Sequence, residues 1–186
     1  MGRRGSDWLH NVSTGWVTLI TTVVFLLFSV LVLPPQAART EGDVGSAESP
    51  DTSFYYSVDD LYRMARVYGE QGRAAYVRAR FTFDVIWPLI YTAFLGTAIS
   101  WIYARVCAVG SRWRRANLIP VLGALFDYLE NLSASIVMAR YPQQTVVVDR
   151  LTPVFTMVKW VFVSGSFAVL LLGVIVGIWS WVKRRG

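Results

Sequence analysis

The feature of this sequence that most constrains its fold is a set of four long apolar blocks separated by polar or arginine-bearing segments. A helix needs about 20 apolar residues to cross the roughly 30 Å hydrocarbon core of a bilayer, because each residue adds about 1.5 Å. Four segments meet this requirement: residues 12–33, 81–104, 118–138 and 152–182. The sequence therefore predicts an all-α integral membrane protein, a four-transmembrane-helix bundle that forms a single membrane domain over residues 1–186.

The composition agrees with this prediction and excludes other classes of protein. Apolar residues make up 54% of the chain and charged residues 16%, whereas a soluble domain carries about 25% charged residues. The net charge of +6 arises from basic residues at the ends of the apolar blocks, so we expect no nucleic-acid partner. A single cysteine, Cys107, and a single histidine, His10, are too few for a disulfide, a thiol cluster or a histidine metal site.

The distribution of basic residues predicts the orientation of the spans. They precede the first span, lie between the second and third spans, and close the chain: Arg3, Arg4, Arg105, Arg112, Arg114, Arg115, Lys183, Arg184 and Arg185. By the positive-inside rule, both termini and the 105–117 loop are expected in the cytoplasm, and residues 34–80 and 139–151 are expected to face outward. The plasma (cytoplasmic) membrane is the expected location and membrane lipids are expected partners, while partner membrane subunits or a homo-oligomer remain open.

The outward segment is predicted to begin with a flexible loop. Pro34 and Pro35 are expected to stop the first helix, because proline lacks the N–H that an intrahelical hydrogen bond needs. Residues 36–52 are rich in Ala, Gly, Ser and acidic side chains and contain little apolar surface. This composition is typical of a flexible loop.

An amphipathic helix is predicted to follow that loop. Ser57 and Asp60 match a capping arrangement, in which the serine oxygen accepts from free N–H groups of the first turn. Apolar and small residues then recur at three- and four-residue spacing: Leu61, Ala65, Tyr68, Gly72, Ala75 and Ala79. The pattern predicts an extracytoplasmic amphipathic helix over residues 58–80, either interfacial, with arginines on lipid phosphates, or a lid over a cavity.

Several ionisable residues fall within the predicted spans, where each costs about 2.5–3.5 kcal/mol on insertion scales. If the second span is continuous through residue 80, its polar residues share a narrow sector, and the third and fourth spans each present a polar face as well. The candidate ligand- or ion-binding residues are Asp84, Asp127, Glu130, Asn131, Lys159, Tyr91, Arg73 and Arg80. Together they predict a polar intramembrane site that opens outward.

Three functions compete for this site. The leading hypothesis is a small integral membrane protein that binds or handles a cation, a proton or a polar lipid headgroup there, as a single chain or as a subunit of a larger membrane complex. The alternative is an outer-leaflet lipid-modifying enzyme in which Asp127, Glu130 and Asp84 supply oxygen ligands to a divalent cation such as Mg²⁺ or Ca²⁺, or act as an acid and base pair.

The third hypothesis is a structural accessory subunit without a site, in which Lys159 neutralises Glu130 or Asp84 and the polar contacts fix the helix register. The sequence holds no nucleophile motif or phosphate-binding motif that would select a reaction.

Overall fold

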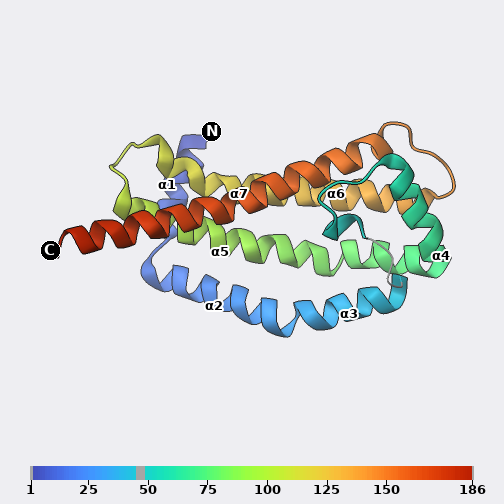
Figure 1. Cartoon of the computed structure of the whole chain (residues 1–186), viewed down its shortest axis with the longest axis horizontal. Helices are drawn as coiled ribbons and strands as arrows, with labels where there is room; N and C mark the ends of the chain where they lie inside the picture. Colours follow the sequence, from blue (N-terminus) through green and yellow to red (C-terminus); the bar gives the residue numbers. More distant parts are fainter. Residues whose placement is uncertain (1, 45–48, 186) are drawn as a thin grey trace. The chain divides into compact units, whose positions relative to one another are not determined.

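The computed structural model describes residues 2–44 and 49–185, and all regular elements in these two ranges are helical (Figure 1). In chain order they are α1 (Gly2–Val12), α2 (Gly15–Leu31), α3 (Leu33–Val44), the 3-10 helix η1 (Pro50–Thr52), α4 (Val58–Arg80), α5 (Phe83–Val106), the 3-10 helix η2 (Arg112–Leu118), α6 (Ile119–Arg140) and α7 (Val148–Lys183). Four helical stretches are long and apolar enough to cross a membrane: Gly15–Gly42, Val58–Val106, Arg112–Arg140 and Val148–Lys183. The predicted all-α chain with four candidate spans is thus confirmed.

The chain divides into two compact units. Unit 1 consists of the residues up to Leu26, of Leu89–Ala124 and of the residues from Val161 onward, and unit 2 consists of Leu27–Pro88 and Leu125–Trp160. Four of the helices, α2, α5, α6 and α7, contribute residues to both units. The boundaries between the two units fall inside these helices and not in loops.

The end of the first apolar block differs from the sequence-based expectation. Pro34 and Pro35 do not stop the helix but lie in the first turn of α3, which continues from α2 with a bend (Figure 1). The N–H of Gln36 donates to the carbonyl of Val32 at 3.2 Å, so the helical hydrogen bonds resume directly after the prolines. Proline is tolerated in the first turn of a helix because the N–H groups there have no intrahelical acceptor.

The segment expected to be a flexible loop is consequently shorter and partly ordered. Residues 36–44 belong to α3, and η1 covers Pro50–Thr52, with Pro50 buried. Residues 45–48, which the loop prediction also included, lie outside the described residues.

Helix α4 has the bounds predicted for the amphipathic helix, and its cap is the predicted one. Ser57 Oγ accepts from the N–H of Asp60 at 3.1 Å, and the N–H of Ser57 donates to Asp60 Oδ2 at 3.0 Å, a complete capping box. Inside α4, Gly69 has φ 65° and ψ −176°. Only glycine adopts this backbone conformation readily, so Gly69 is where the helix kinks.

The apolar core of unit 2 lies between α4 and α6. Its buried members are Tyr56, Leu61, Met64, Ala65, Tyr68, Tyr76, Ala134, Val137 and Met138. The α6 residues among them are separated by three and four positions and therefore share one helix face. Of the expected amphipathic face of α4, the first four positions through Gly72 are buried. Beyond the kink at Gly69, Tyr76 and Arg80 are buried in place of Ala75 and Ala79.

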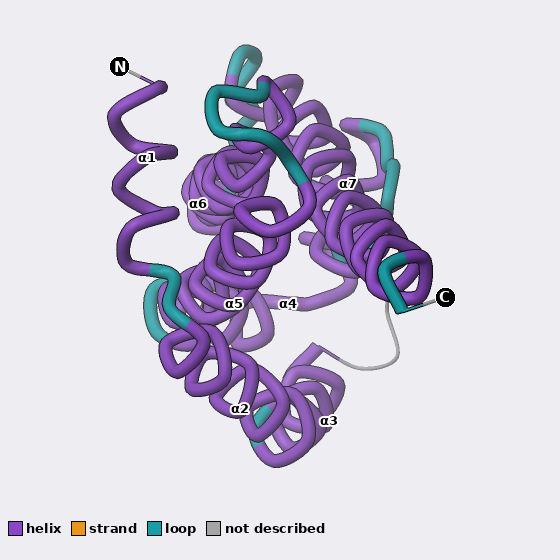
Figure 2. The backbone as a smooth tube through the Cα atoms, turned by 90° about the vertical axis from the view of Figure 1, so that its left-hand side faces the viewer, coloured by secondary structure: helices purple, strands orange, loops and turns teal. Residues whose placement is uncertain are grey.

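The N-terminal helix α1 packs against η2 within unit 1. Residues 13–14 join α1 to α2, and Figure 2 shows the two helices running in different directions. Asn117 Nδ2 donates to the carbonyl of Ser6 at 3.1 Å and to Ser100 Oγ at 2.9 Å. The two ring nitrogens of His10 lie 3.0 Å from the carbonyl oxygens of Ser100 and Arg114. These polar contacts hold α1 on the turn that joins α5 to α6.

Helices α5 and α7 of unit 1 approach closely at two glycines of α7. A Cβ atom added to Gly173 would lie 2.6 Å from Tyr103 Cε2 and 2.9 Å from Ile102 Cγ2, and one added to Gly177 would lie 3.7 Å from Val106 Cγ1. The Tyr103 hydroxyl donates to the carbonyl of Val169 at 3.0 Å, so its ring is held in place. The glycines therefore serve helix contact within the chain.

Replacing Gly173 with alanine is expected to destabilise the protein by about 1–3 kcal/mol, because the new methyl group overlaps the fixed Tyr103 ring. The thermal unfolding midpoint of the purified protein in detergent measures this loss. The matched control is Gly165→Ala on the same helix, where a Cβ atom meets nothing within 4 Å. Equal midpoints for the two variants would contradict the close α5–α7 contact.

A buried charge cluster

Five elements of unit 2 bring polar side chains together. Asp51 lies on η1, Arg80 is the last residue of α4, and Asp84 is in the first turn of α5. Three residues of α6 follow at spacings that place them on one helix face, and Lys159 comes from α7. The resulting charge cluster consists of Asp51, Arg80, Asp84, Asp127, Glu130, Asn131 and Lys159.

The ammonium group of Lys159 is surrounded by three carboxyl groups. Its Nζ is in direct contact with Glu130 Oε2 and lies 3.6 Å from Asp51 Oδ1 and 3.7 Å from Asp127 Oδ1. The side chain of Lys159 is 6% exposed and that of Glu130 is 0% exposed. Because water is excluded from this contact, each charge depends on its protein partners for stabilisation.

Arg80 provides the second cation of the cluster. Its Nη1 contacts Asp51 Oδ2 directly and lies 3.1 Å from Asp84 Oδ2. The guanidinium carbon lies 4.4 Å from the centre of the Tyr76 ring, a cation–π contact. Of the two pairings expected for Lys159, the one with Glu130 is present, and Asp84 pairs with Arg80 instead.

Asp51 joins the two cations, because its two oxygens face different partners: Oδ2 contacts Arg80 and Oδ1 faces Lys159. The buried Pro50 of η1 holds its backbone against unit 2. Asp51 is a member of the cluster that the sequence does not distinguish from the other acids of the expected loop. The one sequence signal near it is the aromatic residue Tyr56, which is buried beside the cluster.

Neutral groups add hydrogen bonds around the cluster. The Asn131 side chain accepts from Arg80 Nη1 at 3.4 Å and donates to the carbonyl of Asp84, also at 3.4 Å. The hydroxyls of Tyr56 and Thr156 lie 2.8 Å apart beside Glu130. Burial, reinforced by the negative charge of Glu130, raises the pKa of Tyr56, so its phenol stays neutral and adds no charge.

Carboxyl groups outnumber cations in the cluster. Four carboxyl groups face the two cations, so the fully ionised cluster carries two excess negative charges: the acids are Asp51, Asp84, Asp127 and Glu130. The exposed fraction of their side chains ranges from 0% for Glu130 to 24% for Asp51. An excess of this kind in a poorly hydrated environment is relieved by a bound proton or a bound cation.

The structure brings together six of the eight residues that the sequence singled out: Arg80, Asp84, Asp127, Glu130, Asn131 and Lys159. The other two lie elsewhere. Tyr91 is buried in unit 1. Arg73 belongs to unit 2, but its guanidinium donates to the carbonyl of Ala65 at 2.9 Å and lies 4.6 Å from the centre of the Tyr141 ring.

Arg73 lies away from the cluster because it precedes Arg80 by seven residues, about 10 Å along α4 at the rise of an α-helix. Its expected alignment with Asp84 depended on one continuous helix through residue 80, whereas α4 ends at Arg80 and Phe81 has φ −95° and ψ 4°. Two non-helical residues before α5 change the helix phase, so residues of α4 and α5 do not form one stripe. Arg80 and Asp84 still meet because both lie beside this break.

The carboxyl groups that the sequence offers as divalent-metal ligands each face a cationic side chain. Asp84 pairs with Arg80, and Asp127 and Glu130 face Lys159. Within residues 2–44 and 49–185, no group of three His, Cys, Asp or Glu side chains is arranged to hold a metal ion. The geometry thus favours ion pairs over a divalent-metal centre.

Comparisons with known proteins assign no family to the chain: no protein-family model, curated protein or solved structure matches it. Its function is therefore argued from the charge cluster and from the pattern of apolar helices.

Replacing Lys159 with methionine is expected to lower the free energy of unfolding by about 3–5 kcal/mol, because the fully buried Glu130 then lacks a cation. Denaturant or thermal unfolding of the purified protein in detergent measures the loss. Adding Glu130→Gln to this variant should restore part of the stability, because the carboxylate that needed the cation is gone.

The control for this prediction is Arg63→Gln, which breaks a pair with Asp60 whose side chains are 60% and 36% exposed. An exposed pair contributes below about 1 kcal/mol, so this variant should unfold almost as the parent does. Losses of similar size in Lys159→Met and Arg63→Gln would show that the charge cluster is hydrated and not interdependent.

Proposed function

We propose that the chain is a multi-pass protein of the plasma (cytoplasmic) membrane that binds a small monovalent cation, a proton or an alkali ion, at the charge cluster. Four apolar helical stretches support membrane insertion, and the basic residues that flank them support a topology with both termini in the cytoplasm. In this topology α4 and the loop from α6 to α7 face outward, and the cluster lies in the outer half of the bundle.

The single observation that carries this proposal is the excess of carboxyl groups over cations in a buried cluster. Ionisable residues inside a membrane protein are costly, and their most frequent uses are ion pathways and proton relays. A cluster with equal numbers of both signs would be satisfied by its own ion pairs. This one needs one or two additional positive charges, which exchangeable protons or alkali ions provide.

A cationic ligand fits the cluster better than the other candidates do. Both Lys159 and Arg80 are engaged by carboxylates, which leaves an anionic lipid headgroup no cation of the cluster to bind without breaking an ion pair. A lipid-modifying enzyme that uses a divalent metal would need a group of ligands for it, and the described residues form no such group. No observation favours catalysis at this site.

Cysteine labelling tests the topology. In a Cys107→Ser background, Val109→Cys, at a position that is 90% exposed, is expected to react with a membrane-impermeant maleimide only after the cells are permeabilised. Gln144→Cys, in the exposed loop between α6 and α7, is expected to react in intact cells. Reaction of both variants from the same side of the membrane would refute the proposed topology.

Infrared spectroscopy of the protein in lipid nanodiscs tests cation binding, because a protonated carboxyl group has its own C=O stretching band. In sodium-free buffer at neutral pH we expect such a band, and we expect Glu130→Gln to remove it. Sodium that displaces the proton should weaken the band and raise the unfolding midpoint above that in choline chloride of equal ionic strength. At about 100 times its Kd, a ligand stabilises the folded state by about 2.7 kcal/mol.

The control variant is Asp59→Asn, which removes an exposed carboxyl group outside the cluster and should leave the band unchanged. A band that persists in sodium identifies the proton as the ligand. The absence of a protonated-carboxyl band, together with equal unfolding midpoints in sodium, potassium and choline, would leave the cluster a purely structural feature and overturn the proposal.

A further inference from the structure

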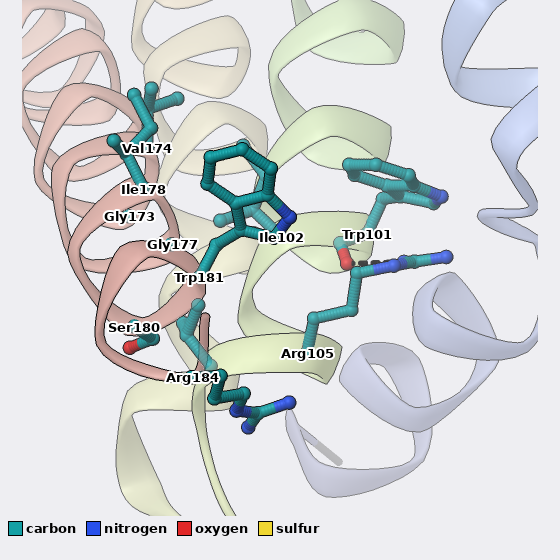
Figure 3. A pocket seen from close by; sticks show the side chains of 11 residues that line it. Trp101, Ile102, Arg105, Gly173, Val174, Gly177, Ile178, Ser180, Trp181 and Arg184 are labelled. Carbon is teal, nitrogen blue, oxygen red and sulfur yellow. Dashed lines mark hydrogen bonds between the residues drawn. The ribbon is translucent and has the colours of Figure 1, made fainter. Parts of the chain in front are cut away.

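A pocket of about 350 Å³ lies between α5 and α7 of unit 1 and takes no part in the charge cluster. Figure 3 shows its lining, with Trp101 and Arg105 projecting from α5, Trp181 from α7 and Arg184 from directly after the end of α7. None of its lining residues is acidic. Its size is at the lower end of the roughly 300–1,000 Å³ found for ligand pockets, so it fits part of a larger molecule.

The pocket walls are apolar because α7 turns small and aliphatic residues toward α5. Gly177 lies beside Val106, and Val174 and Ile178 line the same side of the pocket. The residues of α7 and directly after it that line the pocket run from Gly173 to Arg184, a length of about 16 Å at the rise of an α-helix. The result is an elongated apolar groove rather than a round cavity.

One end of this groove is positively charged. The Arg105 guanidinium lies 3.7 Å from the centre of the Trp101 ring and donates from Nη1 to the carbonyl of Trp101 at 2.7 Å. These two contacts hold the guanidinium in place while using one of its five N–H donors. Arg184 also lines the pocket and lies below the Arg105 guanidinium in the view of Figure 3.

We infer that this pocket is a binding site for an anionic phospholipid. One acyl chain follows the apolar groove along Val174 and Ile178, and the phosphate lies between Arg105 and Arg184, whose fork of N–H donors matches phosphate oxygens. The two tryptophans occupy the level of the headgroups, where indole rings are enriched. The inference rests on the proposed membrane insertion but is independent of cation binding at the charge cluster.

The charge of the pocket favours a lipid over a second copy of this chain. The glycine face of α7, which would be the natural contact of a helix dimer, is already packed against α5 at Gly173. The remaining opening combines an apolar groove with a cationic end, and this combination complements a single anionic amphiphile. An apolar helix from another chain would leave both guanidinium groups without an anion.

Native mass spectrometry of the full-length chain in detergent tests the inference with phosphatidylglycerol and phosphatidylcholine of identical acyl chains. The parent protein is expected to bind phosphatidylglycerol roughly tenfold or more tightly. The double variant Arg105→Gln/Arg184→Gln should lose this preference. The control Arg112→Gln/Arg115→Gln removes the same charge from η2, outside the pocket lining, and should keep it.

A second pair of variants tests the groove without changing charge. Ile178→Trp fills the groove and should weaken phosphatidylglycerol binding to a similar extent. Ile175→Trp, on the same helix but outside the lining, should leave phosphatidylglycerol binding unchanged. Ile178 is 59% exposed and Ile175 is 53% exposed, so the fold should accommodate both substitutions. Equal binding by these two variants, or a parent protein that binds both lipids equally, would overturn the inference.

Competition distinguishes a lipid from a free phosphate compound. Glycerol phosphate should not displace phosphatidylglycerol at equal concentration, because it lacks the acyl chain that fills the groove; displacement would overturn the lipid assignment. The sodium response and the infrared band of Arg105→Gln/Arg184→Gln should equal those of the parent. Failure of the lipid site is thus distinguishable from failure of the charge cluster as a cation site.

Discussion

The contact between Lys159 and Glu130 is the interaction on which the arrangement of unit 2 depends. The effective penalty for removing an ion from water is several kcal/mol, and neither side chain retains enough exposure to recover it from solvent. The charges are stable only where α6 and α7 bring them together. Asp51 extends this dependence to Arg80, and through Arg80 to the end of α4 and the start of α5. The ion pairs that continue from this contact therefore link five elements.

The apolar core makes this ionic arrangement possible. The face of α6 that carries Glu130 and Asn131 continues one turn later with Ala134, Val137 and Met138, which pack beneath α4. Burial of these residues holds α4 against α6 without any charge, and the position of Arg80 at the end of α4 follows from it. Buried ion pairs alone are weak evidence of stability, because desolvation offsets most of their attraction. The core supplies the stability, and the ion pairs supply the specificity of pairing.

Much of this arrangement could be predicted from the sequence, because a residue that is costly to bury stands out within an apolar block. An ionisable residue within an apolar block is expensive, so the convergence of Asp84, Asp127 and Lys159 was foreseeable, as was the capping box of α4. The position of Asp51 was not foreseeable, because an acidic residue in a segment of loop composition is expected to be solvated and gives no sign of burial. The continuation of the helix past Pro34 was not foreseeable either, since proline stops a helix or begins one according to the tertiary contacts beyond it. Arg73 lies about two turns before Arg80 on α4 and so stays apart from the cluster.

The two units hold their helices together by different physical means, and this difference bears on function. Unit 1 relies on shape, with Gly173 against Tyr103, the Thr21 and Thr97 hydroxyls 2.7 Å apart, and no described ion pair. Contacts of that type respond to side-chain volume and are insensitive to pH and salt. Unit 2 relies on charge, which responds to both. The charges of unit 2 are buried between η1, α4, α5, α6 and α7, so a change in any one of them alters the forces between these elements. In unit 1, a charged group such as Arg105 contacts an aromatic ring and a backbone carbonyl and forms no described ion pair.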